Sequence, residues 1–341
     1  MDPEALIRWY RSHGRALPWR VDPRGRLDPW HVLVSEAMLQ QTQVATALPY
    51  FQRFLERFPD AASLARGQET EVLKLWEGLG YYSRARRLKA AAEVLVERHG
   101  GRVPADASAV RALPGVGRYT AGAVLSNAFN LAEPIVDGNV ARVLSRQLDL
   151  CDPVDGTIGQ RRLWAEATSL VQAASSPRDL NQGLMELGAL VCTPRSPSCL
   201  LCPVAGSCAA RAAGTIGSRP VKKLKRKKRA ALHRVAVMRR GGRVLLRQRP
   251  TPGLWAGLWE FPTLEDQAES LAGRVLLRFS HATTHLDITF VVQEVSVKPA
   301  GMQAASWHTL EAAAALPMSN PQRRVLAAVV EQDDPADPPA A

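Results

Sequence analysis

Residues 113–139 of this 341-residue chain are LPGVGRYTAGAVLSNAFNLAEPIVDGN. The pattern predicts a tight glycine turn, a helix, a loop, and an aspartate at the start of a further helix. Gly115 and Gly117 can adopt positive φ without a Cβ penalty, and such a turn directs backbone N–H groups outward. We expect the turn of Gly115, Val116 and Gly117 either to seat one phosphate at a helix N-terminus or to be a simple glycine cap between two core helices.

Asp137 and Asn139 stand at the start of the next predicted helix, whose apolar residues recur with helical spacing from Val140 onward. Asp137 is a suitable N-cap. A carboxylate held at a helix N-terminus, next to a phosphate site, is also suited to face a developing cation. The sequence therefore allows two interpretations of Asp137, a helix cap and a catalytic carboxylate.

The length favours two domains, and a hydrophobic content of 46% is enough for full cores. A net charge of +12 and a pI of about 10.0 suit a polyanionic partner. We find no apolar run of about 18 residues, so no transmembrane helix is expected. The N-terminal MDPEALIRWY contains acidic residues and lacks the apolar segment of a secretory signal.

Residues 1–215 are predicted to be helical, because amphipathic segments of helix length alternate with Pro and Gly. These segments are 3–13, 29–42, 44–58, 69–78, 83–99, 106–112, 118–129, 138–148, 158–174 and 179–191. In the second segment, Leu33, Val34, Ala37 and Met38 form the apolar face, and Glu36 lies off it. Periodicity alone favours a solvent-exposed glutamate.

Four of the five cysteines form a cluster, in which six, two and five residues separate Cys192, Cys199, Cys202 and Cys208. Four thiolates at such spacing can hold one [4Fe–4S] cluster, and the alternative is structural zinc. Clustered cysteines favour metal in a reducing compartment over disulfides. Cys151 is expected to be an ordinary buried thiol.

From residue 233 the pattern changes to period two, which predicts a sheet-containing second domain. A hairpin is expected to turn at Gly241 and Gly242, followed by strands near 274–280 and 285–297 and a helix over 321–331. The basic segment 219–229 reads as a solvated linker that can also contact nucleic acid. Residues 333–341 are expected to be a disordered tail.

The motifs LPGVGRYTAGA and VDGNVARV resemble the helix-hairpin-helix and catalytic aspartate of the endonuclease III superfamily of DNA glycosylases, and most closely its MutY family of adenine glycosylases. The resemblance runs from about residue 4 to 330. It implies an all-helical glycosylase domain over 1–215 with an iron–sulfur loop at 192–208. A basic linker over 216–232 and a Nudix-like α/β domain over 233–332 would complete this multidomain α and α+β chain.

The resemblance also implies catalytic roles. SEAMLQQT is similar to the MutY helix that carries the catalytic acid, here Glu36, and Asp137 matches the catalytic aspartate. Tyr119 and Asn139 would position these groups. In superfamily members that also cut the DNA backbone, a lysine occupies the place of Tyr119, and a tyrosine cannot form the Schiff base that such cutting requires. We therefore expect base removal without a lyase step.

Further positions correspond to substrate contacts in the family. Arg15, Arg20 and Gln182 match residues of the adenine pocket. Matches to residues that contact DNA are, besides the glycine turn, Gln41, Thr42, Leu79 and Tyr81. Leu79 and Tyr81 would enter the base stack, and the alternative is a glycine-bounded turn with buried aromatics.

The second domain resembles the Nudix-like domain of the family but lacks the glutamate-bearing helix pattern that a working Nudix hydrolase needs after WEFP. It is therefore expected to recognise a base rather than hydrolyse a nucleotide. FSHATTHL, residues 279–286, matches the loop that recognises 8-oxoguanine, with Phe279, Ser280 and His281 at its centre. A simple turn at a strand end is the alternative.

Together these features predict an adenine DNA glycosylase that acts on adenine opposite 8-oxoguanine or guanine. The expected partner is duplex DNA carrying such a mispair, with no membrane association. A monomer is expected, located in the cytoplasm and, in a bacterium, associated with the nucleoid. The alternatives are a bifunctional glycosylase/lyase similar to endonuclease III and a non-catalytic protein that binds damaged DNA.

Overall fold

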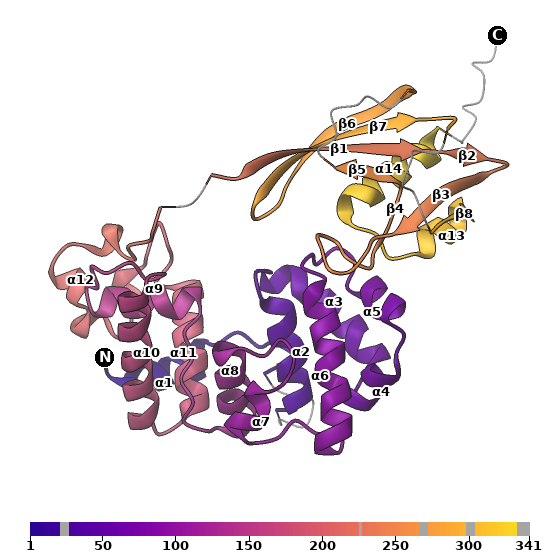
Figure 1. Ribbon diagram of the computed structural model, residues 1–341. Coiled ribbons are helices and arrows are strands. Elements are labelled where there is room, and N and C mark those ends of the chain that lie inside the picture. Colours follow the sequence, from indigo (N-terminus) through magenta and orange to yellow (C-terminus); the bar gives the residue numbers. More distant parts are fainter. Residues whose placement is uncertain (21–26, 225–226, 266–271, 298–303, 333–341) are drawn as a thin grey trace, which may run out of the picture. The chain divides into compact units, whose positions relative to one another are not determined.

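The computed structural model describes residues 1–20, 27–224, 227–265, 272–297 and 304–332. Backbone contacts divide the chain into two compact units, residues 1–65 with 87–225 and residues 66–86 with 226–341 (Figure 1). The predicted tail at 333–341 lies outside the described residues, as do residues 225–226 of the predicted linker. Within the described part, no helix is both long and apolar enough to span a membrane.

In the described residues of the first unit, all regular secondary structure is helical. Its helices are α1 (Pro3–His13), α2 (Pro29–Leu39), α3 (Val44–Arg57), α7 (Ala107–Arg111), α8 (Arg118–Phe129), α9 (Gly138–Gln147), α10 (Thr157–Ala173), α11 (Pro177–Leu190) and α12 (Ala209–Ala212). Short 3-10 turns follow at η1 (Cys199–Leu201), η2 (Ala205–Ser207) and η3 (Ile216–Ser218). Two more helices, α4 (Ala61–Arg66) and α6 (Ser83–His99), cross the boundary between the units.

The ten predicted helical segments are confirmed, with ends within three residues of those observed. Sequence signals explain the helix starts. Asp2 and Asp28 each cap a helix with the side chain, and a proline follows in the first turn. The short helices α4 and α12 were not predicted, because each is too brief to show a periodic apolar face.

Helix α11 is the centre of the first unit, since it packs against α1, α8 and α9, and α8 in turn packs against α2 (Figure 1). Large aliphatic side chains fill the space between these helices. They include Leu6, Ile7, Val140, Leu144, Leu184 and Leu187. Each of the core helices therefore has its position fixed by at least one neighbour far away in the sequence.

The glycine turn before α8 differs in one respect from the prediction. Gly115 has a φ of +79°, and a Cβ at this position would lie 2.7 Å from Cβ of Arg87. Gly117 has extended backbone, with φ −89° and ψ −179°, and does not use the positive φ that is open to a glycine. Gly117 is the N-cap of α8, where the chain must be extended before it enters the helix.

The second unit contains α5 (Glu69–Leu75) and two small sheets. The first sheet has the order β5 (Thr263–Glu265), β1 (Arg229–Val237), β7 (Leu286–Glu294) and β6 (Arg274–Ala282), with β1 and β7 parallel. The second joins β2 (Arg239–Arg240), β3 (Arg243–Gln248) and β4 (Trp259–Glu260), and β8 (Ala305–Thr309) also pairs with β3. Helices α13 (Leu310–Ala315) and α14 (Asn320–Glu331) complete this unit.

The predicted hairpin is confirmed at its turn. Gly241 and Gly242 both have positive φ, and Arg240 pairs with Arg243 across them. Before the turn, the strand that pairs with β3 consists only of Arg239 and Arg240. The preceding strand, β1, pairs with β5 and β7 of the other sheet instead. The chain thus changes sheets just before the turn.

Gly122 provides a test of the packing that positions Asp137. A Cβ on Gly122 would lie 2.3 Å from the carbonyl oxygen of Pro134, in the loop that leads to Asp137. We expect Gly122→Ala to lower the free energy of unfolding by about 1–3 kcal/mol through overpacking, although alanine is the better helix former. Thermal melts would measure the loss. Gly217→Ala is the control, because a Cβ at Gly217 meets nothing within 4 Å; equal melting temperatures for the two variants would contradict the argument.

Candidate active site

A cavity of about 470 Å³ opens in the first unit. Side chains from α2, α8, the start of α9, α11 and the segment after α1 line it. Nine of the residues predicted from the sequence meet there: Arg15, Arg20, Glu36, Gln41, Thr42, Tyr119, Asp137, Asn139 and Gln182. The fold therefore brings the predicted catalytic and adenine-binding residues to one place.

Glu36 lies on α2 and is only 5% exposed, so the solvent-exposed glutamate that periodicity favoured is wrong. The helix is buried on almost every side, including at Ser35 and Met38. Burial raises the pKa of Glu36 to about 7, a hydrogen bond with Tyr119 opposes this, and the charge of Asp137 adds to it. Among the described residues, Oε2 of Glu36 has no hydrogen-bond partner. The carboxyl is therefore suited to hold a proton near neutral pH.

Asp137 is the N-cap of α9, and its Oδ1 accepts a hydrogen bond from the backbone N–H of Val140 at 2.7 Å. The Asn139 side chain donates to Oδ2 at 3.3 Å. Burial raises the pKa of Asp137, while the backbone N–H groups of Val140 and Asn139 oppose the rise by stabilising the charged form. The two sequence interpretations are thus compatible, because the cap also lines the cavity.

Tyr119 occupies the first turn of α8. Its hydroxyl forms a hydrogen bond with Glu36 and lies 3.6 Å from the sulfur of Met185. Burial, together with the nearby carboxyls of Glu36 and Asp137, raises the pKa of Tyr119 well above its ordinary value. The phenol therefore remains neutral, and its hydroxyl donates to the sulfur of Met185 at 3.6 Å.

The two predicted arginines of the adenine pocket share a partner that the prediction missed. Arg15 Nε and Arg20 Nη2 contact Glu186 at 2.5 and 2.6 Å, and the Glu186 side chain is fully buried. Burial raises the pKa of Glu186, but these arginines together bring it below its ordinary value. Glu186 follows Gln182 by one helical turn, and that spacing could have drawn attention to it.

Gln182 is itself 3% exposed, and its Oε1 accepts a hydrogen bond from the hydroxyl of Tyr10 at 2.5 Å. Gln41, at the end of α2, has a φ of +60°, which turns the chain sharply beside the cavity. These two polar residues and Thr42 line the cavity.

Leu79 and Tyr81 belong to the second unit rather than to the unit that holds the cavity. Leu79 is buried, whereas Tyr81 is 46% exposed with a φ of +48°. Of the two predicted wedges, only Tyr81 is presented at the surface.

The predicted recognition residues Phe279, Ser280 and His281 lie on β6, which is followed by a turn into β7. Phe279 is buried and stacks on Phe290 with 4.8 Å between ring centroids. Ser280 is exposed and His281 is half-buried. Phe279 therefore anchors the strand, and the other two side chains can reach a ligand.

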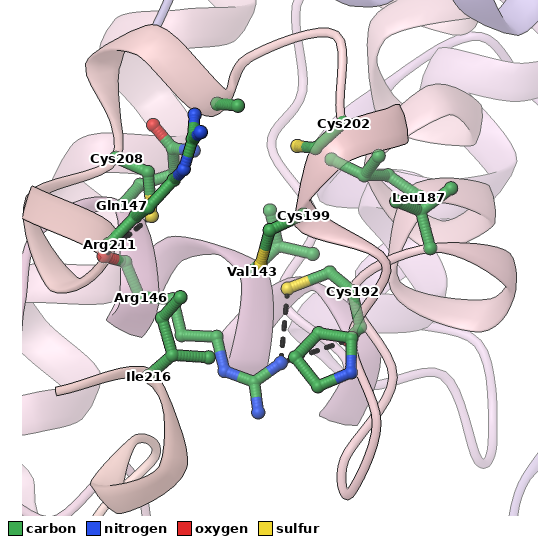
Figure 2. A pocket seen from close by; sticks show the side chains of 13 residues that line it. Val143, Arg146, Gln147, Leu187, Cys192, Cys199, Cys202, Cys208, Arg211 and Ile216 are labelled. Atoms are coloured by element: carbon green, nitrogen blue, oxygen red, sulfur yellow. Dashed lines mark hydrogen bonds between the residues drawn. The ribbon is translucent and has the colours of Figure 1, made fainter. Parts of the chain in front are cut away.

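The four clustered cysteines line one pocket that follows α11, as Figure 2 shows. In the described part of the chain, no three His, Cys, Asp or Glu side chains lie close enough to hold a single metal ion. Four cysteine side chains around one pocket are a donor set that fits a [4Fe–4S] cluster. Cys151 is exposed, so its predicted burial is wrong.

Two arginines of α9 connect this segment to the cavity, and sequence reasoning missed both. Arg142 donates to Asn139 Oδ1 and to the carbonyl of Cys192, both at 2.8 Å. Arg146 is 2% exposed and donates to the sulfur of Cys192 at 3.3 Å and to the carbonyl of Thr193 at 2.8 Å. The cysteine segment is therefore fastened to the helix that Asp137 caps.

Comparisons with known families agree with this geometry. Residues 34–158 match the HhH-GPD superfamily of base excision DNA repair proteins. Residues 192–208 match the iron–sulfur binding domain of endonuclease III, and residues 234–328 match the NUDIX domain. The fold class is thus a helix-hairpin-helix glycosylase domain joined to a Nudix-like domain.

Individual relatives decide the family. The adenine DNA glycosylase of Schizosaccharomyces pombe is 36% identical over 323 residues, covering 78% of this chain and 70% of that protein. The chain belongs to the adenine DNA glycosylase family. The human adenine DNA glycosylase is 39% identical over 325 residues, covering 80% of this chain and 59% of its own length.

This family member spans less than two thirds of the mammalian and plant relatives that it matches. Its helical unit also resembles a solved thermostable thymine-DNA glycosylase, with a TM-score of 0.54 and 29% identity over 62% of this chain and 95% of the other. The match at 192–208 supports a [4Fe–4S] cluster in this glycosylase family member, and the four cysteines of that segment line one pocket.

The pKa of Glu36 predicts a pH-dependent cost in stability. Between the ordinary value of 4.5 and about 7, the folded state keeps a proton that the unfolded state has lost, so stability falls as pH rises through this window. We expect Glu36→Gln to gain stability relative to the wild type from pH 5 to pH 8, by up to roughly 3 kcal/mol. Denaturant unfolding at several pH values measures the gain. The exposed Glu56→Gln on α3 is the control, and a difference for Glu36→Gln that does not vary with pH would refute the expectation.

Proposed function

We propose that this protein is an adenine DNA glycosylase that hydrolyses the N-glycosidic bond of adenine mispaired with 8-oxoguanine or guanine in duplex DNA. The observation that carries the proposal is the pair of carboxyls in one cavity. Glu36 is buried with a pKa of about 7, and Asp137 is held by donors that favour its charged form. A proton donor beside a carboxylate is the arrangement used for cleaving glycosidic bonds.

Binding to DNA is supported by the charge and by the glycine turn. The net charge of +12 attracts a polyanion. No side chain in the described part of the chain caps the N-terminus of α8, so its first N–H groups are available to a phosphate. Base removal then requires the nucleotide to leave the duplex, and the cavity offers the space to receive the base.

The side chains of this chain account for each chemical step. Glu36, protonated, donates its proton to N7 of adenine, because neutral adenine is a poor leaving group. Asp137, ionised, stabilises the oxocarbenium-like sugar or traps it covalently, and water completes hydrolysis with Glu36 as the base. Tyr119 and Asn139 hold the two carboxyls through the contacts described above. The [4Fe–4S] cluster, when bound, supplies a cross-link among its four cysteines.

The other functions weighed from the sequence fit less well. A bifunctional glycosylase/lyase needs an amine to form a Schiff base, and the phenol of Tyr119 occupies that position. A protein that only binds damaged DNA gains nothing from a buried, unpaired carboxyl oxygen at Glu36, which carries a cost in stability. A catalytic role for Glu36 accounts for this cost in stability.

Single-turnover kinetics test the proposal. On a duplex with adenine opposite 8-oxoguanine, the wild type should excise adenine and break the strand only after alkali. Its rate should decline above about pH 7, where Glu36 loses its proton. Glu36→Gln should lose about 10²–10⁴ in rate while duplex binding survives. Glu56→Gln should retain the full rate; strand breaks without alkali, or a normal rate for Glu36→Gln, would rule the mechanism out.

Recognition of the opposite base is assigned to the second unit. Adenine is a normal base, so the error signal is the extra oxygen and ring N–H of 8-oxoguanine. Ser280 and His281 offer polar groups next to the β6–β7 turn, on a strand that the stack of Phe279 with Phe290 holds in place. Such contacts can distinguish 8-oxoguanine from guanine.

A double substitution checks this assignment. Ser280→Ala combined with His281→Ala should reduce the preference for adenine opposite 8-oxoguanine over adenine opposite guanine, because about 1–3 kcal/mol of base discrimination is lost. The rate at which adenine opposite guanine is excised should stay at the wild-type value. Ser306→Ala, an exposed hydroxyl on β8, is the matched control. Full preference in the double variant would place recognition elsewhere.

A further inference from the structure

Tyr10 is a half-buried tyrosine of α1 whose hydroxyl contacts a residue of the cavity. The hydroxyl donates to Oε1 of Gln182 on α11 at 2.5 Å. Burial raises the pKa of Tyr10, so the phenol keeps the proton that it donates. Of these two described residues, only Gln182 lines the cavity. Tyr10 therefore acts on the cavity through the side chain of Gln182.

Two glycines leave room for the Tyr10 side chain. A Cβ on Gly14 would lie 2.6 Å from Cε2 of Tyr10, and a Cβ on Gly183 would lie 3.2 Å from Cβ of Tyr10. A larger residue at either position would displace the ring. Because Gly183 follows Gln182 directly on α11, the close approach of α1 at this point brings the hydroxyl to the amide.

The hydroxyl of Tyr10 sets the orientation of the Gln182 amide. An amide that rotates by 180° exchanges its acceptor oxygen for its donor nitrogen. Here the oxygen is engaged by Tyr10. Within the described part of the chain, Nε2 of Gln182 makes no hydrogen bond, yet it is not fully enclosed. Its N–H groups are thus open to a ligand of the cavity, and the ring nitrogens of adenine include acceptors for such donors.

We propose that Tyr10 is a positioning residue of the active site, whose hydroxyl keeps the N–H groups of Gln182 directed at the extruded base. Tyr10 also supports Arg20, whose Cζ lies 5.5 Å from the centroid of the tyrosine ring and whose Nη2 pairs with Glu186 at 2.6 Å. A phenylalanine keeps the ring beside Arg20 and removes only the hydroxyl. Gln182 can then turn its oxygen toward the base, where it repels the acceptor nitrogens.

A double-mutant cycle tests this role, which rests on the proposed function. Single-turnover excision of adenine opposite 8-oxoguanine is measured with the full-length protein and its cluster, for the wild type, Tyr10→Phe, Gln182→Met and the double variant. We expect Tyr10→Phe to slow excision about 2- to 10-fold, the effect of one hydrogen bond, with unchanged duplex affinity. Combined with Gln182→Met it should have no further effect, because the amide that Tyr10 orients is gone. Reactions followed for hours keep the slow variants measurable.

Tyr50→Phe is the matched control. Tyr50 lies on α3 and also has an arginine over its ring, since Cζ of Arg53 is 4.7 Å from the ring centroid. Among the described residues that line the cavity, Tyr50 is absent. Removal of this hydroxyl should therefore leave the excision rate at the wild-type value.

The outcomes distinguish this inference from the proposed function. If the wild type does not excise adenine, the proposed glycosylase function fails, and the role of Tyr10 fails with it. If the wild type is active and Tyr10→Phe either keeps the full rate or slows excision by the same factor with and without Gln182→Met, Tyr10 contributes only to packing and the inference is overturned. A loss that Gln182→Met abolishes, with the full rate in Tyr50→Phe, supports it.

Discussion

The cavity depends on keeping one carboxyl out of water. Glu36 sits on a helix that is buried on nearly all sides, and its charged form is disfavoured there. Two arginines line the same cavity, and an unneutralised guanidinium would lower the pKa of the acid. Arg20 does lower the pKa of Glu36, but burial outweighs this effect, and Glu186 pairs with both Arg15 and Arg20 in a fully buried position. The two guanidinium groups thus line the cavity while Glu36 can keep its proton.

Local sequence patterns were sufficient to predict where the helices lie, but not to predict which side chains are buried. Periodicity located each long helix because one face of most of them is apolar. Periodicity wrongly favoured an exposed Glu36, because parts of the chain far away in sequence cover the polar side of α2. Gly117 does not use the positive φ that is open to a glycine, because it caps α8 with extended backbone. The change of sheets before the Gly241 turn depends on pairing with β7, more than forty residues later.

The residues of the candidate site also divide into those that local sequence motifs predict and those that they do not. Glu36, Asp137 and the cysteines were found because their motifs are short and continuous in sequence. Glu186 and Arg146 were missed because their partners lie far away: Arg15 contacts Glu186 across 171 positions, and Arg146 reaches the Cys192 sulfur across 46. An acid or arginine on a predicted helix carries no signal of such a partner. Only the assembled helices reveal which charges are neutralised and which polar atoms are left for a ligand.

The pairing of α1 with α11 has a consequence for the order of folding during synthesis. The first helix finds its main partner only when residues 177–190 have left the ribosome. Until then Leu6 and Ile7, which are fully buried in the finished protein, have no core to enter. The residues that line the cavity range from Arg15 to Ala189, so the cavity is complete only when nearly the whole helical unit has been made, and until then the nascent chain exposes apolar surface. If translation is delayed before α11 is synthesised, chaperones must protect the nascent chain for longer.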